Sequence, residues 1–482
     1  MEELKIADID MPRYDRASLR PGIVHIGLGN FHRAHQAWYL HRLMQRGQAQ
    51  DWAIWGAGVR DYDAAMRDRL LAQDCLTSLI ELSPVGTRAE VTGAMIDYLP
   101  VAEGNGPLID GLADPRVRIV SLTVTEGGYY IDPASGGFDA AHEDIQHDAV
   151  HPDRPRTAFG AMIAALARRR AEGSGPFTCL SCDNLQGNGA ILRQALLSLA
   201  RMIDADLAAW IDTACSFPNS MVDCIVPATG PRELEMAAAL GLTDTAPVTH
   251  ENFRQWVIED DFCAGRPPLE EVGVIFTQDV HGYEAMKLRI LNAGHQVLAN
   301  AGEILSLATI ADCMADPSVA SLFHKVLGQE VAPFVDAVPG VTAADYIIQT
   351  AERFANPAIR DTTRRVAFDG SARHTGFVLP VVRDALAHQA PVEGLALVEA
   401  LWARMCAGMR EDGTEIAPND PHWAALNAAA LAAKSNPLAW LAQRSLYGDI
   451  ADQAAFATPF KAQLSALWQR GVRPTLAAYL AR

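Results

Sequence analysis

The segment GIVHIGLGNFHRAH, residues 22–35, joins a strand pattern to a helix pattern. Ile23–Ile26 is a short run of mostly β-branched residues, which predicts a strand. Phe31–Arg46 repeats apolar residues at helical spacing, and Gly47 follows it as a stop. The segment therefore predicts a strand, a tight turn and a helix, which is how a βαβ unit begins.

Two glycines, Gly27 and Gly29, occupy the predicted turn. At this place in a βαβ unit, glycines let the backbone approach the pyrophosphate of a dinucleotide, and the N-terminus of the following helix favours its charge. His32 stands where the usual fingerprint has its third glycine, so the motif is incomplete. An ordinary tight turn is the alternative interpretation.

The first half of the chain continues this alternation of strands and helices. Near-continuous apolar runs predict strands buried on both faces, which are typical of parallel sheets. The expected elements are the strands Trp52–Val59, Val117–Val124, Phe177–Cys182 and Ser220–Val226 and the helix Arg156–Glu172. The alternation predicts a mostly parallel sheet with right-handed crossovers, an α/β architecture.

From about residue 284, long Ala/Leu-rich helical patterns replace the strands. The expected helices are Lys287–Leu307, Ser318–Val331, Ala343–Phe354, Gly376–Gln389, Gly394–Met409 and His422–Ala433. We therefore expect two domains. Residues 1–280 form a Rossmann-like, dinucleotide-binding domain with a parallel sheet, and residues 281–482 form a mostly α-helical, substrate-binding domain.

The charge balance of the chain excludes some partners. Its 482 residues carry 40 basic and 58 acidic side chains, a net charge of −18. Such a balance repels nucleic acid and anionic lipid, so we expect neither as a partner. A local basic pocket for a small anion remains compatible with it.

The cysteines and the N-terminus indicate a cytoplasmic protein. Eight cysteines in so long a chain do not form a disulfide scaffold, and the one CxxC pair, Cys179 and Cys182, lacks the second ligand pair of a structural zinc site. We interpret the pair as small buried strand residues. The first residues, MEELKIADID, lack the apolar core of a signal peptide, and no apolar run is long enough to span a bilayer.

An acidic residue follows the second predicted strand, which ends in Val59-Arg60-Asp61. Asp61 is placed to accept hydrogen bonds from an adenosine ribose and to repel a 2′-phosphate, which favours NAD over NADP. Asp63 is the competing candidate, and the adjacent Arg60 weakens the preference. A solvated loop acid is the alternative interpretation of Asp61.

Three polar residues recur along the first helix of the second half. On an α-helix, Lys287, Asn292 and His295 lie at about 0°, 140° and 80°, within one arc. Burying these polar side chains among Leu, Ile and Val costs free energy in a core helix, so the pattern is typical of a functional site. A desolvated lysine can act as a general base, and an amide can stabilise a developing alkoxide. The alternative is an exposed polar stripe.

Five motifs occur together in this chain. They are GxGxFxRxH at Gly27, Gly29, Phe31, Arg33 and His35, SCDN at Ser181–Asn184, PNSMVD at Pro218–Asp223, K-x4-N-x2-H at Lys287, Asn292 and His295, and RDTTRRVAFDGS at Arg360–Ser371. The combination resembles the long-chain, zinc-independent polyol dehydrogenases, a family that includes mannitol 2-dehydrogenase and fructuronate reductase. The resemblance extends over nearly the whole chain.

The resemblance implies an NAD-dependent, metal-independent enzyme that oxidises a sugar alcohol to a ketose, with mannitol favoured. It implies that Lys287 is the general base, that Asn184 and Asn292 hold the alkoxide, and that Glu284 relays the proton to water. The substrate hydroxyls would be held by Asp223, His295, Arg365 and Arg373. The cofactor would be held by Gly27, Gly29, Phe31, Arg33, Asp61 and Glu126; a strand-end surface acid is the alternative for Glu126.

One residue departs from the family pattern. Arg373 stands where many members carry lysine, and arginine presents a planar fork instead of a compact ammonium. The preferred substrate therefore stays open, with an arabinitol or sorbitol dehydrogenase or a fructuronate-type sugar-acid reductase as alternatives. A catalytically silent NAD-binding protein is the remoter one. We expect the substrate between the two domains, and a monomer or a homodimer.

Overall fold

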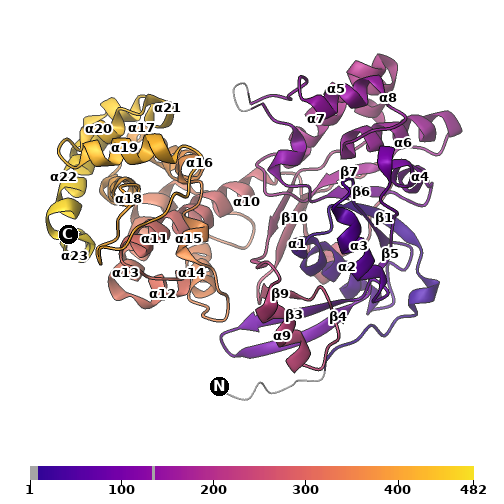
Figure 1. Ribbon diagram of the computed structural model, residues 1–482, viewed down its shortest axis with the longest axis horizontal. Helices are drawn as coiled ribbons and strands as arrows, with labels where there is room; N and C mark the ends of the chain where they lie inside the picture. The colour runs from indigo at the N-terminus through magenta and orange to yellow at the C-terminus, as the bar shows by residue number, and fades with distance from the viewer. Residues whose placement is uncertain (1–8, 133–135) are drawn as a thin grey trace. The chain divides into compact units, whose positions relative to one another are not determined.

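The computed structural model describes residues 9–132 and 136–482. Contacts within the chain divide it into two compact units, Met1–His281 and Gly282–Arg482. The strands β1–β11 lie in the first unit, and the second is built from helices (Figure 1). We describe each unit by itself.

The centre of the first unit is a five-stranded sheet of order β5-β2-β1-β6-β7, with every neighbouring pair parallel. Its strands are β1 (Pro21–Ile26), β2 (Ala53–Ala57), β5 (Met95–Tyr98), β6 (Ile119–Leu122) and β7 (Thr178–Ser181). Because they are parallel, their carboxyl ends meet at one edge. The chain leaves β1 toward β2 on one side and returns to β6 on the other, so β1 is a topological switch point, where α/β proteins bind ligands.

Helices cover both faces of this sheet. On one face Phe159 and Leu196 pack among the core residues of β1 and β6, and on the other Leu40, Leu43 and Trp256 pack beside β1 and β2. The helices of this part are α1 (Asn30–Ala34), α2 (Gln36–Met44), α3 (Asp63–Leu71), α4 (Gly106–Ala113), α5 (Glu143–Val150), α6 (Ala158–Glu172), α7 (Asn188–Ile203) and α8 (Ala205–Ala214).

The first unit also contains two smaller sheets. One has the order β4-β3-β9 and the other β11-β10-β8. The strands are β3 (Thr77–Ser83), β4 (Gly86–Thr92), β8 (Ser220–Asp223), β9 (Val248–Glu251), β10 (Gln255–Glu259) and β11 (Ile275–Thr277), and α9 (Pro231–Ala239) lies between β8 and β9. The strand expected at Ser220–Val226 is therefore present as β8, but it pairs antiparallel with β10, outside the parallel sheet.

The second unit packs around two helices that are apolar on nearly every side. All residues of α11 (Ala293–Ile304) are buried, as are residues 394–405 of α18 (Glu393–Met405). Helices of this kind form a core rather than a surface. The others are α10 (His281–Met286), α12 (Ile310–Ala315), α13 (Pro317–Val326), α14 (Ala343–Phe354), α15 (Thr363–Val366), α16 (Gly370–Arg373), α17 (Leu379–Ala387), α19 (Trp423–Ala433), α20 (Leu438–Leu441), α21 (Arg444–Tyr447), α22 (Ala454–Arg470) and α23 (Val472–Leu480).

Three π-helical turns interrupt the helices of this unit. They are Lys287–Asn292, Leu327–Val331 and His374–Val378. The first separates α10 from α11, so the helix expected over Lys287–Leu307 begins as a π turn and continues as α11 to Ile304. Such turns are rare and occur frequently at functional sites.

Among the residues that the structure describes, no helix combines the length and the apolar character needed to cross a lipid bilayer.

Candidate active site

Gly27 ends β1 in a conformation that only glycine adopts easily. Its φ is +95°, and a Cβ atom there would lie 2.2 Å from the carbonyl oxygen of Thr123. Its amide donates to the Ala57 oxygen at 3.0 Å, which ties the turn to the end of β2. The turn is therefore held between the carboxyl ends of β2 and β6.

Gly29 lies in the same turn, but it is exposed and has an ordinary φ of −80°. A Cβ atom at this position would meet no heavy atom within 4 Å outside its own chain neighbours. The backbone of Gly29 thus borders open space at the switch point of the sheet. This arrangement fits a pyrophosphate approaching the turn, as the sequence predicts.

The helix expected over Phe31–Arg46 is broken. The residue His35 has φ −118° and ψ −91°, so α1 is only five residues long and α2 begins after it. The expectation of one continuous helix over Phe31–Arg46 was therefore wrong. A helix N-terminus still follows the glycine turn, because α1 begins directly after Gly29.

Arg33 supports this turn from inside the protein. Its guanidinium is 1% exposed and donates to the Gly29 oxygen at 3.3 Å, to Asn30 Oδ1 at 2.7 Å and to the Ala246 oxygen. Burial lowers the pKa of Arg33 to about 10, so it stays charged at neutral pH. The neighbouring Phe31 is half-buried and stacks on His35 at 4.7 Å between ring centroids.

The residue at the third-glycine position, His32, packs beneath the turn. Its ring stacks on that of His25 with centroids 3.4 Å apart. His25 bonds Ser121 Oγ at 2.7 Å and Thr123 Oγ1 at 2.8 Å, and neither ring nitrogen of His32 has a hydrogen-bond partner among the described residues. Burial lowers the pKa of both rings, that of His25 to about 3.

We expect the stability of the protein to fall steeply below pH 6.5. Burial also lowers the pKa of His41 to about 4 and of His250 to about 3. Between about pH 6.5 and pH 3, the unfolded chain binds a proton at each of these histidines and the folded protein does not. Each histidine therefore lowers the free energy of unfolding by about 1.4 kcal/mol per pH unit, and the loss levels off near pH 3. Urea unfolding at pH 7.5, 6.5 and 5.5 measures the slope.

The variant His32→Phe isolates one of these protons. It keeps an aromatic ring against His25. The slope of the unfolding free energy against pH should decrease by about 1.4 kcal/mol per pH unit, the contribution of about one proton. An unchanged slope would show that His32 is protonated in the folded state.

The end of β2 carries both acids considered for ribose binding. Asp63 Oδ2 accepts the backbone amides of Val59 and Arg60 at 2.9 and 3.0 Å, so its carboxylate holds the turn. Asp61 is exposed. Arg60 donates to Asp144 Oδ2 at 2.7 Å and to the Tyr130 hydroxyl at 3.1 Å. The geometry favours Asp61 over Asp63 as a ligand-facing acid and gives Arg60 a partner within the protein.

The ends of β6 and β7 are joined by Asp183, which the sequence analysis left without a role. Its carboxylate accepts the amides of Val124 and Thr125 at 3.1 and 2.9 Å and the Tyr129 hydroxyl at 2.7 Å. Thr125 has a φ of +63°, a strained value for a residue with a side chain. Glu126 and Asn184 follow these strand ends, and both are exposed at this edge.

A buried amide, Asn188, links β7 to β8. It donates to the Asp183 oxygen at 3.0 Å and to the Ser220 oxygen at 2.8 Å, and it accepts the Ser220 amide at 2.9 Å. These bonds fix the position of β8, whose last residue is Asp223, 5% exposed. Asp223, the acid that ends the PNSMVD motif, could be recognised in the sequence, but the function of Asn188 could not.

In the second unit, Lys287 begins the π turn and Asn292 ends it. Lys287 is 8% exposed, and Glu284, in α10, is 4% exposed. In a π turn the hydrogen bond spans five residues, so Asn292 comes closer around the axis to Lys287 than the 140° of an α-helix. The α-helical wheel used for the sequence therefore does not describe this turn.

His295 lies in α11, buried against an aromatic ring. It stacks on Phe354 with centroids 4.1 Å apart, and its Nε2 is 3.7 Å from Asp361 Oδ2 without a hydrogen bond. Burial lowers the pKa of His295 to about 4, although the Asp361 carboxylate raises it. The ring is therefore neutral at physiological pH and able to donate one hydrogen bond and accept another.

Three arginines act on the same ring. The charges of Arg365, Arg373 and Arg353 each lower the pKa of His295. Arg365 donates to Asp361 through Nε at 2.8 Å and through Nη2 at 2.6 Å, and Arg373 donates to the Val366 oxygen at 3.2 Å. The structure thus gathers three predicted residues of the second unit and adds Asp361.

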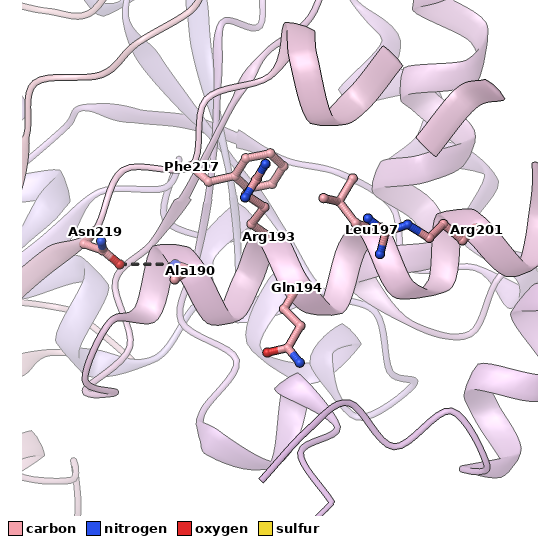
Figure 2. A pocket seen from close by; sticks show the side chains of 7 residues that line it. All are labelled: Ala190, Arg193, Gln194, Leu197, Arg201, Phe217 and Asn219. Atoms are coloured by element: carbon pink, nitrogen blue, oxygen red, sulfur yellow. Dashed lines mark hydrogen bonds between the residues drawn. The ribbon is translucent and has the colours of Figure 1, made fainter. Parts of the chain in front are cut away.

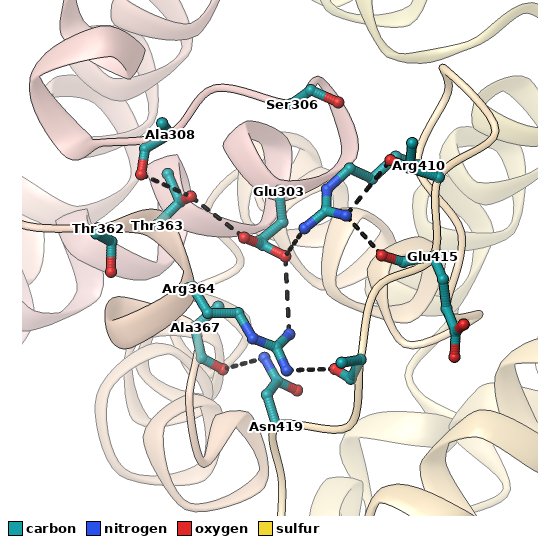
Figure 3. A network of polar contacts seen from close by, with 12 residues as sticks. Glu303, Ser306, Ala308, Thr362, Thr363, Arg364, Ala367, Arg410, Glu415 and Asn419 are labelled. Atoms are coloured by element: carbon teal, nitrogen blue, oxygen red, sulfur yellow. Dashed lines mark hydrogen bonds and ion pairs between the residues drawn. The ribbon is translucent and has the colours of Figure 1, made fainter.

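A second carboxylate anchors the segment before Arg365. Glu303, near the end of α11, is 4% exposed and accepts the Thr363 hydroxyl at 3.3 Å and Arg410 Nη2 at 3.2 Å, and Arg364 Nη1 lies 3.8 Å away (Figure 3). Thr363 also donates to the Leu307 oxygen at 2.8 Å. The start of α15 is therefore tied to the helix that carries His295.

One surface pocket contains none of the predicted site residues. It lies along α7 and is lined by Ala190, Arg193, Gln194, Leu197, Arg201, Phe217 and Asn219 (Figure 2). Asn219 accepts the Ala190 amide at 3.1 Å, and Arg193 pairs with Asp212. In the described ranges, no group of three or more His, Cys, Asp or Glu side chains is arranged to hold a metal ion.

Comparison with known proteins identifies the family. Residues 21–271 match the model of the mannitol dehydrogenase Rossmann domain, and residues 279–468 match that of the mannitol dehydrogenase C-terminal domain. The chain belongs to the mannitol dehydrogenase family. The predicted resemblance and the predicted fold class, a Rossmann-type domain followed by a mainly helical one, are confirmed.

Relatives within the mannitol dehydrogenase family match along their full length. The mannitol 2-dehydrogenase of Cereibacter sphaeroides is 53% identical over 473 residues, which cover 98% of this chain and 99% of the relative. The ternary complex of Pseudomonas fluorescens mannitol 2-dehydrogenase with NAD and D-mannitol is 39% identical, with a TM-score of 0.85 and coverage of 98% and 97%. A substrate-free D-sorbitol dehydrogenase is 35% identical, with a TM-score of 0.90 and coverage of 98% of both chains.

Proposed function

We propose that this protein is an NAD-dependent polyol dehydrogenase that oxidises a secondary alcohol of a sugar alcohol to a ketose, with mannitol to fructose as the favoured reaction. The observation that carries the proposal is the position of Lys287, which is nearly buried at the start of a π turn and is followed by Asn292 and His295. The chain belongs to the mannitol dehydrogenase family, and a relative at 53% identity is a mannitol 2-dehydrogenase.

NAD fits the first unit. The open space beside Gly29 suits a pyrophosphate, and Asp61 is exposed for the ribose hydroxyls. We assign Phe31 and Glu126 to the same cofactor, and Arg33 to supporting the turn that holds it. When bound, NAD supplies the acceptor for the hydride that leaves the alcohol carbon.

Lys287 Nζ takes the proton of the reacting hydroxyl. Asn292 donates its amide N–H to the oxygen as negative charge develops there, and we assign Asn184 of the first unit the same role. Glu284, one turn before Lys287 and also buried, passes the proton on toward water. In the reverse direction, protonated Lys287 returns the proton and a ketose is reduced. No step in this proposal uses a metal ion.

The remaining hydroxyls distinguish one polyol from another. In the second unit, neutral His295 donates and accepts, while Arg365 and Arg373 donate. In the first unit, the carboxylate of Asp223 accepts. A polyol whose hydroxyls have the wrong stereochemistry leaves one or more of these groups without a hydrogen bond. Because an unpaired buried polar group weakens binding, such a polyol should bind less tightly.

An assay of NAD reduction over mannitol, sorbitol and arabinitol, with fructuronate reduction in the reverse direction, tests the proposal. We expect the highest kcat/KM with mannitol. Sorbitol is the second candidate, because a D-sorbitol dehydrogenase matches the fold with a TM-score of 0.90. NAD binding without turnover of any of these compounds would contradict the proposal and support a silent NAD-binding protein.

A cytoplasmic location and a monomeric or homodimeric state complete the proposal. The acidic net charge of −18 supports the expectation that neither nucleic acid nor an anionic membrane surface is a partner.

A further inference from the structure

Asp361 is a buried carboxylate with both oxygens engaged by a single guanidinium. Its side chain is 6% exposed, and Arg365 donates to Oδ1 through Nε and to Oδ2 through Nη2. The backbone of Asp361 is fixed as well, because its oxygen accepts the Ile310 amide at 2.8 Å. The carboxylate therefore holds Arg365 in one orientation from a rigid position.

The opposite side of Arg365 remains open to a ligand. The arginine side chain is 62% exposed, and a guanidinium has five N–H donors, of which Asp361 takes two. The Oδ2 atom of Asp361 also lies 3.7 Å from His295 Nε2, too far for a hydrogen bond. The carboxylate thus orients Arg365, offsets its charge and lies beside His295.

We propose that Asp361 is a specificity-determining positioning residue: by fixing and neutralising Arg365 beside His295, it selects uncharged polyols and ketoses over sugar acids. The inference rests on the proposed function. A carboxylate substrate needs a cation whose charge is not already compensated. Asp361 takes the Nε–Nη2 edge of Arg365 and supplies the opposing charge, so the open edge offers donors with little net charge.

The variant Asp361→Asn removes the charge and keeps the shape. An asparagine accepts one N–H from Arg365, but its NH₂ group then faces the second donor, so the guanidinium is released toward the open side. The liberated Arg365 loses its fixed position for hydroxyls and gains an uncompensated positive charge for a carboxylate. The two substrate classes should therefore respond in opposite directions.

The test compares fructose and fructuronate reduction by NADH, as the ratio of the two kcat/KM values. We expect Asp361→Asn to shift the ratio toward fructuronate by about tenfold or more, mainly through KM. The matched control is Asp452→Asn, which breaks another two-bond pair with an arginine, Arg444, on the exposed surface. That control should leave the ratio within about twofold of the wild type.

A second variant covers a folding failure of the first. Arg365→Gln removes the exposed partner and leaves the Asp361 charge, so it should shift the same ratio about tenfold or more away from fructuronate. Equal losses for both substrates, or an unchanged ratio in either variant, would overturn the inference and leave Asp361 a structural residue. If the wild type reduces neither compound, the proposed function fails; if it reduces fructose and the ratios do not move, only this inference fails.

Discussion

Lys287→Ala should lose about 10²- to 10⁴-fold in kcat for polyol oxidation, the usual contribution of a positioned general base. The lysine is nearly buried at the start of the π turn, and alanine there can neither accept the hydroxyl proton nor recruit water easily into its place. Because the variant lacks the group that accepts the hydroxyl proton, kcat should fall. The increase of kcat with rising pH should also disappear from the pH profile. Steady-state kinetics from pH 6 to pH 10 measures both.

The control for Lys287→Ala is Lys461→Ala, an exposed lysine of α22. It should keep wild-type kinetics, and both variants should bind NAD with wild-type affinity in a fluorescence titration. Partial recovery of Lys287→Ala by added primary amines would support the role of the missing base. Retention of most of the wild-type kcat would remove Lys287 from the mechanism.

Gly29→Ala should weaken NAD binding by about 100-fold or more while leaving the fold intact. A methyl group at this position points into space that no protein atom occupies, so it obstructs a ligand rather than the protein. The backbone φ of −80° accommodates alanine, and the loss of glycine at a helix N-cap costs about 1 kcal/mol of unfolding free energy. Calorimetric titration with NAD and urea unfolding measure the two effects separately.

Gly27→Ala provides the contrast. Here the new Cβ would lie 2.2 Å from a backbone oxygen at a φ of +95°, so we expect a loss of about 3 kcal/mol or more of unfolding free energy. If Gly29→Ala destabilised the protein as much as Gly27→Ala, or bound NAD normally, the space beside Gly29 would not be the pyrophosphate site.

Local patterns predicted four of the five strands of the central sheet and missed the edge strand β5. The run Ile23–Ile26 and the glycines after it lie in β1 and its turn, and the apolar runs around Val120 and Leu180 are β6 and β7. These strands are short, continuous and apolar because they are buried on both faces, and that burial is visible in the sequence itself. The family motifs then fixed the candidate residues.

Pairing between distant segments could not be predicted in the same way. β8 lies beside β10 and β3 beside β9, and no local pattern states which strand is the neighbour. The break at His35 was also missed, because apolar residues continue at helical spacing on both sides of it. Tertiary packing decided these features.

The supporting residues of the site escaped prediction for a related reason. Asp183, Asn188 and Asp361 act through partners that only the fold brings to them, such as the Thr125 amide or the Arg365 guanidinium. A sequence shows the type of such a residue but not what it holds. Asp361, four residues before Arg365, was the one with a detectable spacing.

The π turn at Lys287–Asn292 makes the number of residues in this segment as important as their chemistry. A π turn is equivalent to an α-helix with one residue inserted. Deleting a single residue between Lys287 and Asn292 would restore the α-helix and rotate Glu284 and Lys287 by about 100° relative to Asn292 and His295. A relative with a one-residue gap here would keep every side chain to which we assign a catalytic role and still lose their arrangement. We therefore expect alignment gaps in this segment to mark altered activity.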